Sequence, residues 1–139
     1  MRLYYPDAIQ GKYIDIVDPK IEDVEEALRG IDNKNRPEVT LYIFPGYLKV
    51  SVDDSNQRVL VCYCQTNPNQ GDCTEKCPTD TSLTQRHSEL VSFTAANGEG
   101  FHAKLSQTVT RDVALEIVLY IYQHESAPEF VTWTDSRFW

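Results

Sequence analysis

Two stretches of the chain repeat their apolar residues with the period of an α-helix. The first, "DPKIEDVEEALRG" over residues 18–30, keeps its apolar residues on one stripe and its acidic residues on the other. Asp18 is a favourable N-cap and Gly30 a favourable stop, so they set the expected ends of this helix. The second, "TRDVALEIVLYIYQHE" over residues 110–125, has a broader apolar stripe and Thr110 as its expected N-cap. We expect this second helix to be the more deeply buried of the two.

Elsewhere apolar and polar residues alternate, which is typical of β-strands with one buried face. The segments "EVTLYIF" and "YLKVSVD" flank Pro45-Gly46, so we predict a hairpin in which Phe44 lies opposite Tyr47. Further strands are predicted over residues 2–5, 12–17, 58–64, 89–95, 101–105 and 130–134.

The turn "DDSN" sets the register of the next hairpin. If Val52 lies opposite Val59, the apolar residues of both strands share the core face. Leu60, Cys62 and Cys64 then point to the opposite face of the sheet, because side chains alternate along a strand.

The order of these elements is strands, a helix, antiparallel strands, a second helix and a last strand. This order predicts an α+β fold, with an antiparallel meander sheet and both helices packed on one face. We expect one domain over residues 1–139, since this is the length of an ordinary domain. Residues 65–86 show no periodic pattern and are expected to form one long loop.

The chain is acidic, with 21 Asp and Glu against 13 Lys and Arg and a formal net charge of −8. A negative surface repels phosphate backbones, so direct binding of nucleic acid is disfavoured, whereas a basic partner would be attracted. The first residues contain no apolar core of a secretory signal, and no apolar run reaches the length of a membrane span. We therefore expect a cytoplasmic protein that does not bind membranes.

Catalytic motifs are absent from the sequence, which contains no nucleophile elbow, phosphate-binding glycine loop or zinc-protease motif. The triplet His87-Ser88-Glu89 has the His-x-Glu spacing of zinc deaminases. In those enzymes the paired cysteines follow the histidine, whereas all four cysteines here precede it. The sequence thus gives no support for an enzyme, and we expect no cofactor.

The four cysteines lie within sixteen positions, in "CYCQTNPNQGDCTEKC". A Cys-x-Cys pair followed by Cys-x-x-x-Cys is a weak match to a structural zinc site, which commonly uses two Cys-x-x-Cys pairs. Disulfides are rare in the cytosol, although they are compatible with the spacing. Zinc binding, disulfides and free thiols therefore all remain open for Cys62, Cys64, Cys73 and Cys77.

The C-terminal third, "NGEGFHAKLSQTVTRDVALEIVLYIYQHESAPEFVTWTD", resembles the closing segment of a known family. This is the first-numbered immunity family of bacterial polymorphic toxin systems. In that family a short strand leads into an apolar helix, a turn and a strand that closes on tryptophan. The upstream hairpin is also similar, so the resemblance covers roughly residues 37–135. The positions that carry it are Ala103, Leu105, Ala114, Leu115, Val118, Tyr120 or Ile121, Pro128, Val131 and Trp133.

This resemblance implies a non-enzymatic inhibitor that binds a cognate toxin domain and blocks its active site. Toxins paired with this family are often nucleic-acid deaminases, and other immunity families face nucleases. The acidity of the chain agrees independently, because an enzyme that acts on nucleic acid needs a basic cleft. The alternative is a small zinc-stabilised adaptor or regulatory domain that uses the Cys62–Cys77 segment for recognition.

Candidate partner-binding residues are acidic side chains in predicted turns and loops. Asp53 and Asp54 lie at a predicted hairpin tip, where we expect them to be exposed. Reversing both to lysine should then weaken binding and leave thermal stability nearly unchanged. Asp72 and Glu75 lie in the predicted long loop, and Glu99 lies in the "NGEG" turn.

Overall fold

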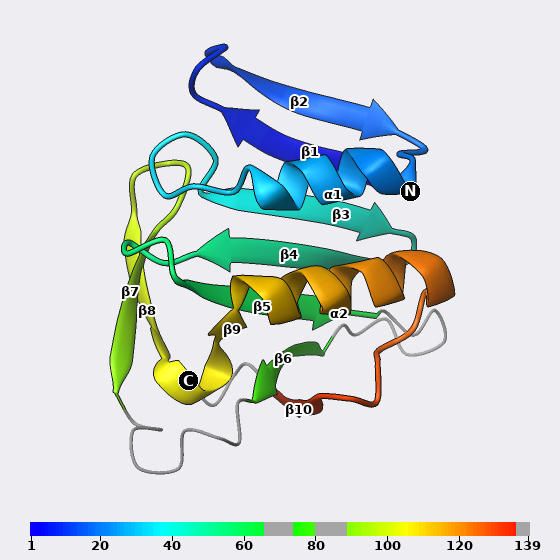
Figure 1. The fold of residues 1–139 in the computed structure, drawn as a ribbon, viewed down its shortest axis with the longest axis vertical. Helices are drawn as coiled ribbons and strands as arrows, with labels where there is room; N and C mark the ends of the chain where they lie inside the picture. Colours follow the sequence, from blue (N-terminus) through cyan, green and yellow to red (C-terminus); the bar gives the residue numbers. More distant parts are fainter. Residues whose placement is uncertain (66–73, 80–88, 136–139) are drawn as a thin grey trace.

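An antiparallel sheet with two helices on one face organises the protein, as the sequence predicts (Figure 1). The computed structural model describes residues 1–65, 74–79 and 89–135. Within them, hydrogen-bonded strands run in the order β10-β6-β5-β4-β3-β1-β2, β9 pairs with β5, and β7 and β8 form a separate hairpin. The strands are β1 (Arg2–Asp7), β2 (Lys12–Val17), β3 (Glu38–Ile43), β4 (Gly46–Val52), β5 (Arg58–Cys64), β6 (Glu75–Thr79), β7 (Leu90–Thr94), β8 (Gly100–Lys104), β9 (Val109–Thr110) and β10 (Thr132–Asp135).

The helices α1 (Ile21–Arg29) and α2 (Arg111–His124) lie side by side over the same face of the sheet (Figure 1). Their apolar stripes and the inward side chains of β1, β3, β4 and β5 form the main core. Three of the nine residues of α1 and four of the fourteen of α2 are buried, so the two helices are buried to a similar extent and, contrary to expectation, α2 is not the more deeply buried one. The sheet therefore has one face covered by helices and one face free of them.

The ends of the helices follow the predicted caps only in part. Thr110 caps α2 as expected, and its side chain accepts a hydrogen bond from the backbone N–H of Val113 at 3.3 Å. The first helix begins at Ile21 rather than directly after Asp18, so the predicted start was wrong. Asp18 has a φ of 52°, and the Asp23 carboxylate instead accepts from the backbone N–H of Lys20 at 2.9 Å.

The first hairpin was predicted on the correct face but in the wrong register. Ile43 lies opposite Gly46, so the β3–β4 turn follows Ile43 rather than Phe44. The turn residues are thus Phe44 and Pro45, joined by a cis peptide bond. Relative to the prediction each partner shifts by two residues, and a shift of two leaves every side chain on its predicted face. In the next hairpin, between β4 and β5, Val52 lies opposite Val59 as expected.

The predicted long loop contains an unexpected strand. Residues 75–79 form β6, which pairs with β5 and β10, so the prediction of one loop over 65–86 was wrong there. Cys77 alternates inward on β6 and is fully buried. It joins Leu60 and Cys62 under Phe93 and Ala103 of the β7–β8 hairpin in a second, smaller core. The hairpin therefore covers part of the helix-free face.

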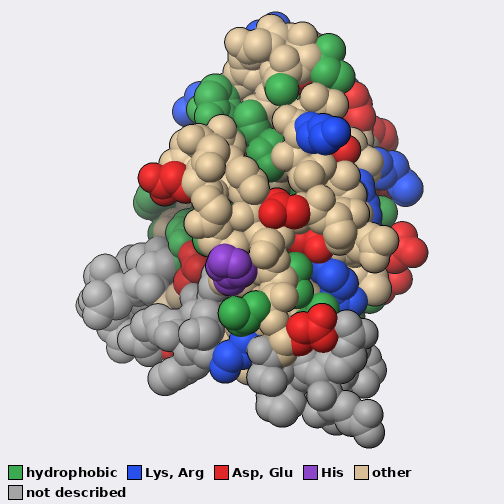
Figure 2. Space-filling model, turned by 90° about the vertical axis from the view of Figure 1, so that its left-hand side faces the viewer, with side chains coloured by type: hydrophobic (Ala, Val, Ile, Leu, Met, Phe, Trp, Pro, Cys, Tyr) green, Lys and Arg blue, Asp and Glu red, His purple; other side chains and the backbone are tan. Residues whose placement is uncertain are grey.

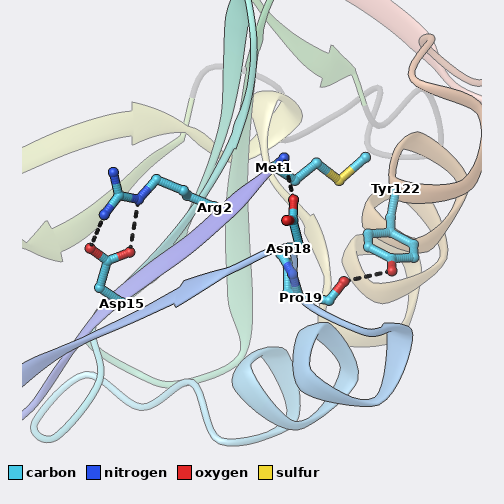
Figure 3. A network of polar contacts seen from close by, with 6 residues as sticks. All are labelled: Met1, Arg2, Asp15, Asp18, Pro19 and Tyr122. Atoms are coloured by element: carbon cyan, nitrogen blue, oxygen red, sulfur yellow. Dashed lines mark hydrogen bonds and ion pairs between the residues drawn. The ribbon is translucent and has the colours of Figure 1, made fainter.

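Polar contacts on both faces of the sheet hold the N-terminal strands in place. The hydroxyl group of Tyr122 in α2 donates to the carbonyl oxygen of Pro19 at 2.7 Å, and the N-terminal ammonium group lies 3.6 Å from the Asp18 carboxylate. On the side of the sheet away from the helices, Arg2 and Asp15 join β1 to β2 (Figure 3). These contacts hold β1 and β2 in place at one edge of the sheet.

Candidate partner-binding surface

Asp53 was expected at an exposed hairpin tip, and that prediction was wrong. Its side chain is only 5% exposed. One carboxylate oxygen accepts from the backbone N–H groups of Gln57 and Arg58, both at 2.9 Å, and the other accepts from the Ser55 hydroxyl group at 2.6 Å. The carboxylate thus binds the polar groups of the β4–β5 turn, a common role of Asp in turns, and it cannot contact a partner.

Asp54 and Glu99 are exposed as expected, and the structure brings their turns to the same side of the molecule. The Asp54 carboxylate accepts from the Thr94 hydroxyl group at 2.9 Å, and its backbone carbonyl oxygen accepts from the Asn33 side chain at 3.0 Å. Glu99 follows in the β7–β8 turn, where its carbonyl oxygen accepts from the backbone N–H of Ala95 at 2.8 Å. Figure 2 shows acidic and basic side chains interspersed on this side, and they do not form one continuous acidic patch.

The other two predicted residues do not join this group. Glu75 lies in β6 opposite Cys64, at the other end of β5 from the turn that holds Asp54. It is half-buried and accepts a hydrogen bond from the hydroxyl group of Tyr47, so it is not a free surface charge. Asp72 lies outside the described residues. The predicted acidic residues therefore do not form one site.

The open part of the helix-free face carries tyrosines instead. Tyr4 of β1 and Tyr13 of β2 stack with ring centroids 5.0 Å apart and planes at 8° to each other. Tyr13 is 53% exposed and Tyr42 of β3 is 46% exposed. Loss of hydration raises the pKa of Tyr4, and the nearby Tyr13 and Tyr42 hydroxyl groups and the Asp15 carboxylate raise it further. Tyr4 also lies directly opposite Asp15 in the strand register, so these groups are close neighbours.

One more apolar side chain, that of Val17, extends this surface at the far end of β2. Val17 and Tyr42 both lie opposite Arg2 in the strand register, so the three residues form a row across the sheet. Val17 is 62% exposed, and Phe44, in the turn that follows β3, is 96% exposed. We call this surface the tyrosine face, and it comprises Tyr4, Tyr13, Val17 and Tyr42, with Phe44 in the adjoining turn at its end.

One ion pair lies within the tyrosine face, between its aromatic residues, and a second lies beside it. Arg2 contacts Asp15 through two hydrogen bonds of 2.7 and 3.2 Å (Figure 3), and Lys49 lies 3.2 Å from Glu38. Exposed ion pairs add little stability, because solvent screens the attraction between the two charges. The result is a surface on which aromatic rings surround the Arg2–Asp15 pair, and protein–protein interfaces are enriched in both aromatic residues and arginine. Its rings can stack on a partner or contact a cationic side chain.

The sequence contained a signal for this face that the acidic residues obscured. Strands β1, β2 and β3 carry tyrosines at positions that alternate with core residues, where a solvent-facing sheet ordinarily carries polar side chains. Tyr4 and Tyr42 follow Leu3 and Leu41 directly along the chain, so the alternation places them outward. The missing information was which part of that face the β7–β8 hairpin would leave open.

The described cysteines do not behave as one group. Cys64 is disulfide-bonded, whereas Cys62 and Cys77 are free and buried; Cys73 lies outside the described residues. Residues 1–65, 74–79 and 89–135 contain no group of three His, Cys, Asp or Glu side chains that could hold a metal ion. A bonded Cys64 also lacks the thiolate that the four-cysteine zinc site requires.

Burial makes Cys62 an unreactive thiol, and this can be measured. Loss of hydration raises the pKa of Cys62, and the neighbouring Glu75 raises it further, so the thiol stays protonated in the folded state. The thiol of an unfolded cysteine ionises at about pH 8.5, and the resulting thiolate reacts readily with alkylating reagents. We expect alkylation of Cys62 at pH 9 to be at least roughly a hundredfold slower in the native protein than in denaturant.

Peptide mapping after a timed iodoacetamide pulse gives the rate for Cys62 separately from the other cysteines. The same pulse in guanidinium chloride provides the reference rate for each peptide. Rates within tenfold of each other would show that the strand pairing around Cys62 opens readily and that its burial is not maintained in solution.

Neither a protein-family model nor a curated protein matches this chain. Among the described residues, no helix is long and apolar enough to cross a membrane.

Proposed function

We propose that this chain is an immunity protein that binds and neutralises a cognate bacterial toxin domain, a deaminase or nuclease that acts on nucleic acid. The observation that carries the proposal is the tyrosine face. Exposed aromatic rings on a sheet bind proteins at low entropic cost because few torsions must be fixed. The resemblance of residues 37–135 to an immunity family supports the same assignment.

The charge of the chain supports a basic target. A protein with a net charge of −8 attracts a basic surface over long range and accelerates encounter with it. A toxin that acts on nucleic acid carries such a surface around its active site. Binding there would occlude the substrate, so inhibition requires no catalytic group in this chain. Asp54 and Glu99 lie on an adjacent side and can contribute to attraction without lying at the centre of the contact.

We further propose that the protein acts in the cytoplasm, where the nucleic-acid targets of such a toxin lie. The disulfide at Cys64 is the feature that fits this compartment least, because cytosolic thiols are kept reduced. The redox state of Cys64 in protein isolated from cells after rapid alkylation tests this part of the proposal by itself. A reduced Cys64 agrees with the cytoplasm, and a fully oxidised one places the protein in an oxidising compartment.

A capture and rescue experiment tests the function. The tagged chain is pulled from its native lysate, and each stoichiometric partner is then expressed alone and together with the chain. We expect one basic partner that arrests growth when expressed alone and is harmless when the chain is present. Metal content is measured on the same sample.

Two outcomes would contradict the proposal. A partner that never arrests growth would show that the chain binds proteins for another purpose. One zinc ion per chain, lost together with the fold on chelation, would favour the zinc-stabilised adaptor instead.

A further inference from the structure

A cleft of about 380 Å³ lies between three turns that are distant in sequence. The β1–β2 turn, the loop between α1 and β3, and the β7–β8 turn form its walls, on the side of the molecule shown in Figure 2. The cleft thus follows the seam between the main sheet and the separate β7–β8 hairpin. Its volume lies in the range of sites for small molecules, which commonly occur where two structural units meet.

Hydrogen bonds hold the three walls in place without a ligand. The backbone N–H of Ala8 donates to the carbonyl oxygen of Asn35 at 3.0 Å, which joins the β1–β2 turn to the α1–β3 loop. Thr94 binds the Asp54 carboxylate, and the Asn33 side chain binds the Asp54 carbonyl oxygen. The β7–β8 turn is thereby tied to the same loop, so the cleft is pre-formed.

The cleft is basic at its rim, in contrast to the acidity of the whole chain. Lys12 and Lys34 both line it, and within the described residues neither ammonium group takes part in a salt bridge. One carboxylate, that of Asp7, also lines the cleft, and the two lysines outnumber it. Both Asp7 and the nearby Asp32 accept hydrogen bonds from backbone N–H groups. Asp7 accepts from the backbone N–H of Gln10, and Asp32 accepts from two backbone N–H groups of its own turn.

The remaining lining is apolar and amide-bearing. The ring of Tyr13 lies at the cleft, stacked on Tyr4 by one side and 53% exposed, and two alanines of the β7–β8 turn lie across from it. We propose that this cleft binds a small anion with a carboxylate or phosphate group and an apolar body. The anionic group would lie between Lys12 and Lys34, and the apolar body against Tyr13. This site does not depend on the proposed toxin.

Anion titration of the intact chain tests the site. Inorganic phosphate and benzoate are added separately to ¹⁵N-labelled protein at pH 7 and constant ionic strength, with sodium chloride as the reference. We expect saturable shifts of backbone amides in residues 11–13, 33–35 and 95–98. The double variant Lys12→Ala/Lys34→Ala should weaken binding at least tenfold. Stronger binding of benzoate than of phosphate would assign a carboxylate ligand, and the reverse a phosphate ligand.

A charge-matched control separates a site from general attraction. The variant Lys20→Ala/Lys76→Ala removes two exposed lysines that do not line the cleft. It should bind the anions as the unaltered chain does. An equal loss in both double variants, or no saturable shift with either anion up to 50 mM, would overturn the proposal. The cleft and the tyrosine face share Tyr13, but the proposed function is tested separately by capture and growth rescue, so neither result would decide it.

Discussion

Replacing Asp53 with lysine is expected to lower the free energy of unfolding by about 3–5 kcal/mol. The substitution removes the acceptor of three hydrogen bonds, which leaves the N–H groups of Gln57 and Arg58 and the Ser55 hydroxyl group without this partner. It also places a cation in a position that is 5% exposed. Burying an unpaired charge is among the most destabilising single changes. Thermal unfolding should occur roughly 10–20 °C lower.

Two further variants separate the hydrogen bonds from the charge. Asp53→Asn keeps a carbonyl oxygen that can accept from both backbone N–H groups, so we expect a loss of only about 1 kcal/mol. Asp54→Lys makes the same change of charge at the adjacent position and serves as the control for Asp53→Lys. Because Asp54 is exposed, it should cost less than about 1 kcal/mol.

Chemical denaturation of the three variants provides the comparison. Equal, small losses for Asp53→Lys and Asp54→Lys would show that the β4–β5 turn rearranges and that the Asp53 contacts do not matter. A large loss for Asp53→Asn as well would assign the effect to the negative charge rather than to the accepted hydrogen bonds.

The same pair of residues shows how far the sequence could be interpreted. The pattern "DDSN" between two alternating segments correctly predicts a turn and the pairing of Val52 with Val59. Which of two adjacent aspartates faces inward depends on where the turn N–H groups point, and the pattern of residue types does not specify this. Reversal of Asp53 was therefore predicted to leave stability unchanged, contrary to the result now expected.

Strand β6, which the sequence analysis missed, depends on distant pairing. Helix α2 and strands β3 to β5 have strong local periodicity, and their existence and buried faces were predicted correctly. Strand β6 has only five residues, includes a proline, and is defined by pairing with β5 and with β10 more than fifty positions away. Local propensity cannot identify a strand of this kind, because partners supply most of what stabilises it.

The candidate site was missed for a related reason. A search for charge finds Asp54 and Glu99, whereas the tyrosine face exists because the helices cover one side of the sheet and the β7–β8 hairpin covers only part of the other. Exposure of Tyr42 and Phe44 is thus a property of the tertiary arrangement. Alternation alone places such rings outward without showing that they remain uncovered.

Phe44→Ala is expected to weaken binding of the cognate toxin by about 2–4 kcal/mol, or roughly 30- to 1,000-fold in Kd. Phe44 is 96% exposed in the turn that ends β3, next to Tyr42, and it therefore contributes little to the fold. A large ring held out from a hairpin is suited to fill an apolar pocket of a partner, where aromatic anchors contribute most of the binding energy. Unfolding of the variant should match that of the unaltered chain within about 0.5 kcal/mol.

Phe130→Ala is the matched control, because Phe130 is also exposed, at 55%, but precedes β10 at the opposite edge of the sheet. Calorimetric titration of each variant against the toxin identified by growth arrest gives the two affinities, and growth rescue gives the consequence in cells. Equal affinities for both variants and the unaltered chain would remove Phe44 from the interface and leave the proposed function standing. A loss with Phe130→Ala alone would move the interface to the β10 edge. Failure of the unaltered chain to bind or rescue would reject the function, since the tyrosine face would then have no toxin to contact.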